Sequence, residues 1–309
     1  MSLYAMLKSK GSTGFGYAST ATDVTAGVSL AGKTILVTGC NSGLGLETMR
    51  VLTARGAHVI GAARTEAKAK EAAATVSGKA TGVACELSDP ASVRACVATV
   101  QGMGLPLDAI IANAGIMALP KLNQAYGYEL QFFTNHIGHF ILVTGLLDRL
   151  ADDGRVVILS SAAHQMAPAG GIQFDNLSGE KNYKGWVAYG QSKIANLLFA
   201  KELSRRFAGT KKTANAIHPG VIATNLGRHL GMSNLVGSLV WGLGDILFLK
   251  TIPQGAATQC YVAANPAAAA VSGEYWADSN IAKPRAEAND AALAAKLWDV
   301  SEKIVAGLA

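Results

Sequence analysis

Short apolar runs typical of β-strands alternate with helical segments along most of this 309-residue chain. The alternation predicts a parallel sheet with helices on both faces, because each connection between parallel strands has to cross one face of the sheet. Asp89-Pro90 is typical of a helix start, and we expect a long helix over residues 124–150. The expected strands cover residues 34–37, 58–60, 83–84, 109–112, 155–159, 214–218 and 272–276.

Nothing in the sequence divides these elements into separate domains. No linker rich in Pro, Gly or Ser and no internal repeat is present between them. We therefore predict an α/β protein with a single-domain Rossmann fold over residues 31–309. Its doubly wound parallel sheet would have about seven strands, with helices on both faces. Residues 1–30 are rich in Gly, Ser and Thr, and we expect them to form a loosely structured leader.

A glycine-rich turn follows the first expected strand directly, with the sequence Thr38-Gly39-Cys40-Asn41-Ser42-Gly43-Leu44-Gly45. Such a turn between a strand and a helix presents backbone N–H groups and a helix N-terminus to a pyrophosphate. Its spacing is GxxxGxG, whereas the commoner dinucleotide spacing is GxGxxG. Glycines at a strand–helix turn can also be purely structural. The turn alone leaves both interpretations open.

The end of the second strand indicates which dinucleotide is bound. An acidic residue at this point holds the ribose 2′-hydroxyl of NAD. This chain has Ala62-Ala63-Arg64-Thr65 there, so no carboxylate is present. The guanidinium of Arg64 suits the 2′-phosphate of NADP. The alternative is a solvated arginine at a helix entrance, but we favour NADP(H) as the cofactor over NAD(H).

Tyr189 and Lys193 lie four residues apart in an expected helix, so their side chains share one face. A phenol titrates near pH 10 in water, and a neighbouring ammonium lowers its pKa. A phenol tuned in this way can give a proton to a carbonyl oxygen or take one from an alcohol. Together with the glycine turn, the pair indicates hydride transfer between a nucleotide cofactor and a carbonyl or alcohol.

In this order, the motifs resemble those of the short-chain dehydrogenase/reductase family over about residues 30–280. The family's TGxxxGxG turn matches Thr38 to Gly45, and its YxxxK pair matches Tyr189 and Lys193. The resemblance implies that the catalytic residues are Asn135, Ser161, Tyr189 and Lys193. It implies that the cofactor is bound by Gly39, Asn41, Ser42, Gly43, Leu44, Gly45, Arg64, Glu86, Leu87, Asn113, Ala114, Gly115, Tyr189, Lys193, Pro219, Gly220 and Thr224.

The resemblance also implies a role for each catalytic side chain. Tyr189 is the general acid/base, and Lys193 lowers its pKa and holds the ribose hydroxyls of the nicotinamide half. Ser161 hydrogen-bonds the substrate oxygen where negative charge develops. Asn135 positions a water that links Lys193 to solvent. Thr224 would contact the nicotinamide carboxamide.

Ser161 and Tyr189 are 28 positions apart, more than is usual in the family. The inserted segment, residues 176–186, resembles the retinol dehydrogenase and protochlorophyllide reductase branches. Protochlorophyllide reductases carry a cysteine two residues after the catalytic lysine, whereas this chain has Ala195. The retinol dehydrogenase-like branch therefore fits best. Reduction of a conjugated C=C bond and a catalytically silent dinucleotide-binding sensor stay open as alternatives.

Half of the residues are hydrophobic, and the formal net charge is +6. No basic stripe with interleaved aromatic residues is present, which argues against nucleic acid as a partner. Residues 230–249 carry a single charge, on Asp245, and the family has a mobile substrate lid here, near residues 223–250. An apolar lid implies an apolar alcohol, aldehyde or ketone as substrate and leaves peripheral membrane contact open. Its many glycines argue against a membrane-spanning helix. A homo-oligomer is also open.

The four cysteines have no CxxC spacing, which favours free thiols in a reducing compartment. The N-terminus has no apolar segment of the secretory kind, and we predict a cytoplasmic location. His136 and His139 have a spacing that could hold a metal, but no Cys or carboxylate completes the set. We therefore expect no metal site. His164 either lines the substrate cleft or belongs to a loop without contact.

Overall fold

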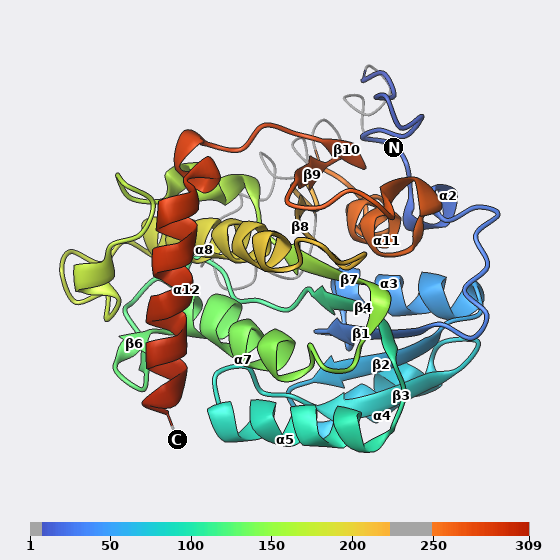
Figure 1. Ribbon diagram of the computed structural model, residues 1–309, viewed down its shortest axis with the longest axis horizontal. Coiled ribbons are helices and arrows are strands. Elements are labelled where there is room, and N and C mark those ends of the chain that lie inside the picture. The colour runs from blue at the N-terminus through green and yellow to red at the C-terminus, as the bar shows by residue number, and fades with distance from the viewer. Residues whose placement is uncertain (1–7, 223–248, 309) are drawn as a thin grey trace, which may run out of the picture.

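Eight strands form one central sheet in the part of the chain that the computed structural model describes, residues 8–222 and 249–308 (Figure 1). Their order is β10-β9-β8-β7-β4-β1-β2-β3. Neighbouring strands run parallel except β9 and β10. The strands are β1 (Thr34–Thr38), β2 (His58–Ala63), β3 (Ala80–Ala84), β4 (Leu107–Ala112), β7 (Leu150–Leu159), β8 (Thr213–His218), β9 (Tyr275–Ala277) and β10 (Asn280–Ile281).

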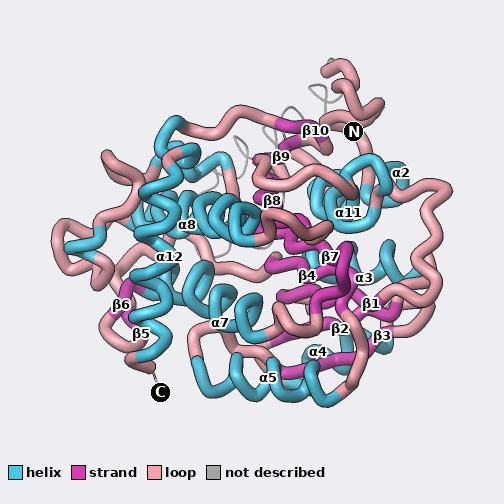
Figure 2. The backbone as a smooth tube through the Cα atoms, viewed as in Figure 1, coloured by secondary structure: helices cyan, strands magenta, loops and turns pink. Residues whose placement is uncertain are grey.

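Helices cover both faces of this sheet (Figure 2). Side chains alternate along β1, so that Leu36 joins one buried apolar cluster while Ile35 and Val37 join the other. The helices on the Leu36 side are α5 (Pro90–Gly102), α7 (Gly138–Gly145), α8 (Gly185–Arg206) and α12 (Ala291–Ala306). Those on the other side are α2 (Ala21–Val24), α3 (Gly43–Ala54), α4 (Glu66–Ala74) and α11 (Ala257–Ala264). The predicted Rossmann-type fold is confirmed.

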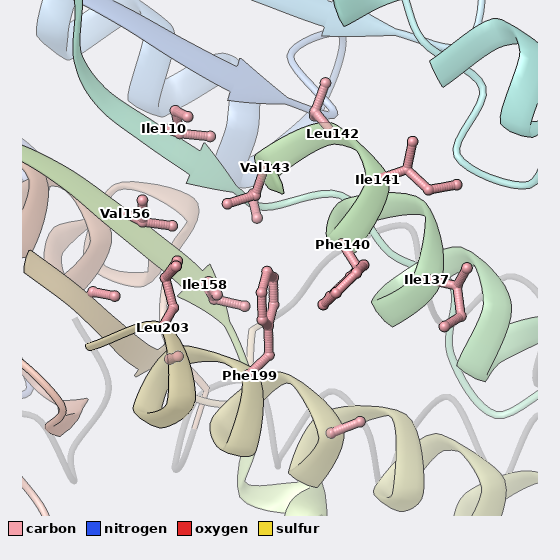
Figure 3. Close-up of a cluster of buried hydrophobic side chains, with 14 of the residues drawn as sticks. Ile110, Ile137, Phe140, Ile141, Leu142, Val143, Val156, Ile158, Phe199 and Leu203 are labelled. Carbon is pink, nitrogen blue, oxygen red and sulfur yellow. The ribbon is translucent and has the colours of Figure 1, made fainter. Parts of the chain in front are cut away.

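Aromatic packing fixes α8, the helix that carries Tyr189 and Lys193. Phe199 of α8 and Phe140 of α7 have ring centroids 5.2 Å apart, between the two helices and the sheet (Figure 3). Trp298 of α12 packs edge-on to Phe140, with its ring centroid 4.9 Å away. Burying aromatic side chains of this size contributes on the order of 1.5–3 kcal/mol each. The helix therefore forms a rigid support for the residues at its N-terminal end.

The end of the sheet has one strand more than the sequence predicts. A single strand is expected over residues 272–276, whereas the structure has β9 and β10 joined by a tight turn. Asp278 and Ser279 form this turn with φ of 51° and 60°. Two consecutive residues with positive φ suit a two-residue hairpin turn. The turn lacks the usual Asn-Gly signal, so the sequence gives no indication of it.

The expected long helix over residues 124–150 is wrong at both ends. Its first residues form a two-stranded hairpin, β5 (Gln124–Ala125) with β6 (Tyr128–Glu129). Tyr126 and Gly127 turn this hairpin with positive φ. Helical structure then begins with α6 (Leu130–Phe132), capped by the Glu129 carboxylate, and continues through the π-helical turn η1 (Phe133–Ile137) into α7. Leu150 already starts β7.

The N-terminal segment is also more ordered than its composition predicts. Over residues 8–30 the chain packs onto α11 and the β9–β10 turn, and Val24 is fully buried. A capping box between Thr20 and Asp23 starts α2. The side chain of Asn280 accepts hydrogen bonds from Thr13 and donates one to the carbonyl of Phe15. The prediction of a loose leader is therefore wrong for residues 8–30, because distant contacts order it.

Candidate active site

The glycine turn between β1 and α3 has the shape that a pyrophosphate site needs. Gly39 and Gly43 have φ of 71° and 53°, in the left-handed region. A Cβ on Gly45 would lie 2.1 Å from the Gly39 carbonyl oxygen, so only glycine permits this close approach. Ser42 begins α3 without a side-chain cap, and a Cβ on Gly43 would meet no described atom within 4 Å. The N–H groups of the first turn thus stay available to an anion.

Arg64 lies beside this turn at the carboxyl end of the sheet. It directly follows β2, and the N–H groups of Gly39 and Cys40 both donate to the carbonyl oxygen of Ala62. The Arg64 side chain is exposed and makes no ion pair with another described residue. Its guanidinium is therefore available to an anionic group bound at this edge of the sheet.

Glu86 and Leu87 follow β3 at the same edge of the sheet. The Glu86 carboxylate accepts hydrogen bonds from the N–H and hydroxyl groups of Ser88, so it is turned toward its own loop. Leu87 is buried, and its carbonyl oxygen packs closely against Gly138. Leu87 therefore joins the loop after β3 to the start of α7.

The segment Asn113-Ala114-Gly115 is fixed to β1 by Thr38. The Thr38 hydroxyl accepts hydrogen bonds from the N–H groups of Asn113 and Ala114, both at 2.9 Å. The Asn113 amide donates to the Thr38 carbonyl at 2.7 Å. A Cβ on Gly115 would lie 3.0 Å from Oδ1 of Asn135. The segment therefore leads from the glycine turn to the first of the four expected catalytic residues.

The structure brings Asn135, Ser161, Tyr189 and Lys193 together where β7 ends. Ser161 follows β7 and caps the short 3₁₀ helix η2 (Ala162–Met166), and its hydroxyl lies close enough to the Tyr189 phenol to lower the pKa of that phenol. The Lys193 ammonium lies 5.4 Å from the centroid of the Tyr189 ring and donates to the Leu159 carbonyl at 3.2 Å. All four fall at the carboxyl edge of the sheet, where ligands bind in open α/β sheets.

Asn135 is held by both functional groups of its side chain. Oδ1 accepts from the N–H of Ile116 at 2.8 Å, while Nδ2 donates to the carbonyl of Ile116 at 2.9 Å. Nδ2 also donates to the hydroxyl of Ser192, one residue before Lys193. The side chain therefore ties α8 to the segment that follows Gly115.

The pKa values differ in direction from the expectation for Tyr189. Burial raises the pKa of Tyr189 to about 12, although the hydrogen bond from Ser161 opposes this. Burial also lowers the pKa of Lys193 to about 8. Both shifts have one cause, because removing water disfavours the charged form of each group. The expected lowering of the phenol pKa by Lys193 is therefore outweighed, and Tyr189 keeps its proton firmly.

His218 is a site residue to which the sequence analysis assigns no role. Its Nδ1 accepts hydrogen bonds from the N–H groups of Ala162 at 3.2 Å and Gly220 at 3.4 Å. Burial lowers its pKa to about 4, so the ring is neutral and can accept. His218 thereby joins the loop after Ser161 to the turn Pro219-Gly220. The motif His218-Pro219-Gly220 is visible in the sequence, but the link to Ala162 is not.

His164 and Lys250 also support the site. The Nδ1–H group of His164 donates to the Ser161 carbonyl at 2.6 Å, and its Nε2 accepts from the N–H of Arg285. His164 is therefore a buried loop support, 2% exposed. Lys250 packs against Gly220 and pairs with Asp278 at 2.6 Å. Neither contact could be inferred from spacing along the chain.

The inserted segment places an aromatic side chain beside Tyr189. Trp186 lies in the first turn of α8, and its ring packs edge-on to that of Tyr189 with centroids 6.1 Å apart. It is 41% exposed. Met166, in the 3₁₀ helix after Ser161, and Val221, after the Pro219-Gly220 turn, are also exposed apolar side chains. Three segments that carry site residues thus also carry exposed apolar groups.

Two predicted features lie outside the residues that the structure describes. They are Thr224 and most of the predicted lid, residues 223–248. No helix within residues 8–222 and 249–308 has the length and apolar character to cross a membrane.

The four cysteines are free and buried, as expected. His136 and His139 each hydrogen-bond protein groups, Ser301 in one case and Thr38 and Asn135 in the other.

Comparison with known proteins identifies the family. The profile for short chain dehydrogenase matches residues 33–234. The chain belongs to the short-chain dehydrogenase family. The chloroplastic short-chain dehydrogenase TIC 32 A of Brassica napus is 42% identical over the whole of both chains. Human retinol dehydrogenase 14 is 40% identical, covering 89% of this chain and 86% of its own.

Among solved structures, an uncharacterized protein from Mycobacterium Paratuberculosis has a TM-score of 0.75 and 34% identity, covering 92% of this chain and 97% of that one. Members of the short-chain dehydrogenase family bind nicotinamide dinucleotides, and its retinol dehydrogenases are among the similar proteins. The expected resemblance is confirmed, and the chain is an oxidoreductase of this family. The residues of the glycine turn fit a dinucleotide pyrophosphate by their geometry, as described above.

Proposed function

We propose that this short-chain dehydrogenase interconverts an apolar alcohol with its aldehyde or ketone, using NADP(H) and Tyr189 as general acid/base. The observation that carries the proposal is the cluster of Tyr189, Ser161 and Lys193 at the end of β7, in which the buried Lys193 ammonium lies 5.4 Å from the centroid of the Tyr189 ring and Ser161 acts on the pKa of the Tyr189 phenol. The two hydroxyls can converge on one substrate oxygen. A glycine turn that suits a pyrophosphate opens at the same edge of the sheet.

The glycine turn and Lys193 would hold NADPH, which when bound would supply the hydride for reduction of the substrate carbonyl. As the carbonyl oxygen gains negative charge, the Ser161 hydroxyl stabilises it by a hydrogen bond. Tyr189 then gives its proton to that oxygen. Burial raises the pKa of the phenol, so the proton is present at neutral pH. Lys193, whose pKa is about 8, is still cationic at pH 7 and stabilises the phenolate that results. Tyr189 recovers its proton from solvent.

Arg64 supports NADP(H) as the cofactor. No carboxylate stands at the end of β2 to hold a ribose 2′-hydroxyl, and the exposed guanidinium suits a phosphate instead. The exposed side chains of Trp186, Met166 and Val221 support an apolar substrate. We therefore place the apolar part of the substrate beside Trp186, with its oxygen at Ser161 and Tyr189.

A panel of apolar alcohols, aldehydes and ketones tests the proposal, with NADP(H) and NAD(H) supplied in parallel. We expect NADPH to be consumed with an apolar aldehyde or ketone and the alcohol to be formed. A product with its carbonyl intact and a C=C bond reduced would instead indicate a conjugated C=C reductase. Cofactor binding without turnover of any compound would indicate a dinucleotide-binding sensor.

A further inference from the structure

We propose that His139 is a positioning residue that links the cofactor-binding end of β1 to the backbone of Asn135. The inference deepens the proposed function and rests on it. His139 is the second residue of α7, one helical turn after Asn135, and it is fully buried. Its ring contacts one group on each side, and both groups belong to segments that form the site.

The hydrogen bonds determine which ring nitrogen carries the proton. Nδ1 lies 2.9 Å from the carbonyl oxygen of Asn135, which can only accept, so Nδ1 is the donor. Burial, together with the nearby Lys193 ammonium, lowers the pKa of His139 to about 4, so the ring is neutral and Nε2 is an acceptor. Nε2 lies 2.9 Å from the Thr38 hydroxyl, which therefore donates to it.

Thr38 can accept two backbone hydrogen bonds because its proton points to His139. The Thr38 oxygen accepts hydrogen bonds from the N–H groups of Asn113 and Ala114. Its O–H group donates to Nε2 of His139. Every polar group of this chain of contacts then has a partner. The ring thus sets the orientation of the Thr38 hydroxyl, which in turn holds the segment beside the cofactor turn.

At its other end, the ring fixes the carbonyl of Asn135 inside the π-helical turn η1. This turn is wider than an α-helical one, and it brings the Asn135 side chain to Ile116 and Ser192. Removing the His139 donor would take this hydrogen bond away from the carbonyl oxygen of Asn135, a fully buried residue. We infer that the turn would then shift and move Asn135 relative to Lys193.

His136 provides a matched control within the same turn. It is also fully buried and makes one ring hydrogen bond, between Nε2 and the Ser301 hydroxyl at 2.9 Å. Its surroundings are the rings of Phe132, Phe140 and Phe199 rather than the site. Substitution of His136 therefore reports the structural effect of losing a buried histidine from this helix.

Two conservative variants separate the two ends of the link. In His139→Asn, the amide nitrogen takes the place of Nδ1 and keeps the donor for the Asn135 carbonyl, while the acceptor for Thr38 is lost. In His139→Gln, the longer side chain places an amide oxygen near the Thr38 hydroxyl, while the donor for Asn135 is lost. His139→Leu removes both contacts, and His136→Leu removes neither.

The experiment measures kcat, substrate KM, the cofactor Kd by fluorescence titration and the melting temperature for each variant. We expect kcat to fall about tenfold in His139→Gln with the cofactor Kd nearly unchanged, because one buried group loses its partner. We expect the Kd to rise about tenfold in His139→Asn with kcat nearly unchanged. His139→Leu should show both effects. His136→Leu should lower only the melting temperature.

The inference is overturned if the His139 variants lose stability alone, as His136→Leu is expected to do. It is also overturned if the Asn and Gln variants exchange their effects, or if both are equal to wild type in kcat and Kd. Should His139→Leu fail to fold, the Asn and Gln variants still decide the question. Tyr189→Phe separates the two proposals. If that variant keeps its turnover, the proposed function fails, whereas an inactive Tyr189→Phe beside unaffected His139 variants rejects only the role of His139.

Discussion

The glycine turn after β1 and the cluster around Tyr189 lie at the same edge of the sheet, but they are built in opposite ways. The turn is formed by backbone, and a Cβ on Gly45 would collide with the Gly39 carbonyl. The cluster consists of buried polar side chains, such as Lys193 and Asn135, each held by a backbone group. The turn should therefore be sensitive to added volume, and the cluster to the loss of a single polar atom.

Removing the phenol oxygen of Tyr189 should have the largest effect on the cluster. Tyr189→Phe keeps the ring against Trp186 but removes the phenol hydroxyl that would donate the proton. We expect kcat to fall about a thousandfold, with the cofactor Kd and the unfolding midpoint nearly unchanged. Steady-state kinetics and a cofactor titration provide the measurement. Near-wild-type turnover would exclude Tyr189 as the general acid/base.

Adding one methyl group should have the largest effect on the glycine turn. In Gly45→Ala the new Cβ would lie 2.1 Å from the Gly39 carbonyl oxygen, so the turn must open. We expect cofactor affinity to fall about a hundredfold, from strain of the size known for overpacked cores. Isothermal titration measures the Kd.

Gly102→Ala is the control for this substitution. Gly102 ends α5, has no positive φ, and a Cβ there would meet no described atom within 4 Å. We expect this variant to bind the cofactor as the wild type does. Equal affinity in the Gly45 and Gly102 variants would show that the turn does not depend on close backbone approach.

Substitution of Arg64 should have a smaller effect on cofactor binding, because its side chain is exposed. Arg64→Leu should reduce the preference for NADPH over NADH about tenfold, since a charge-assisted contact to the 2′-phosphate is lost. The ratio of kcat/KM for the two cofactors is the measurement. Lys68→Leu removes another exposed cation, on α4, and should leave the ratio unchanged. A similar loss with both cofactors would argue against recognition of the 2′-phosphate.

The smallest predicted effect is that of His136 on the pH dependence of folding stability. Burial lowers the pKa of His136 to about 3, against 6.5 in an unfolded chain. As the pH falls below 6.5, the unfolded state therefore takes up a proton that the native state does not, and stability is lost. The contribution is about 1.4 kcal/mol per pH unit for one such histidine. Above pH 6.5 this contribution to the pH dependence vanishes.

His136→Leu should therefore reduce the slope of unfolding free energy against pH by about 1.4 kcal/mol per unit between pH 6 and 5. Between pH 7.5 and 8.5 its slope should equal that of the wild type. Denaturant unfolding at each pH gives the values. An unchanged slope at acidic pH would mean that His136 is protonated in the native state.

The sequence predicts local features of this molecule well. The strand, glycine turn and helix from Thr34 to Ala54 are contiguous, and Tyr189 and Lys193 are four residues apart on one helix. The sequence does not predict the contacts that hold the cluster together. His218 with Ala162 and Lys250 with Asp278 join residues that are far apart in the chain. Their identity depends on the fold as a whole.

Other differences between prediction and structure also have physical reasons. The hairpin that replaces the first part of the expected long helix turns at Tyr126-Gly127, where a bulky residue adopts positive φ. The direction of the Tyr189 pKa depends on burial, which the YxxxK spacing does not reveal. The short α2 is ordered by distant partners such as Asn265 rather than by its own four residues.

The most direct test follows the hydride itself. NADPH deuterated at the transferred position of the nicotinamide would be incubated with the best apolar aldehyde or ketone from the substrate panel, and the product examined by NMR. The account predicts one deuterium on the former carbonyl carbon in the wild-type reaction and no labelled product with Tyr189→Phe. Deuterium on any other carbon, or labelled alcohol formed at an undiminished rate by Tyr189→Phe, would contradict it.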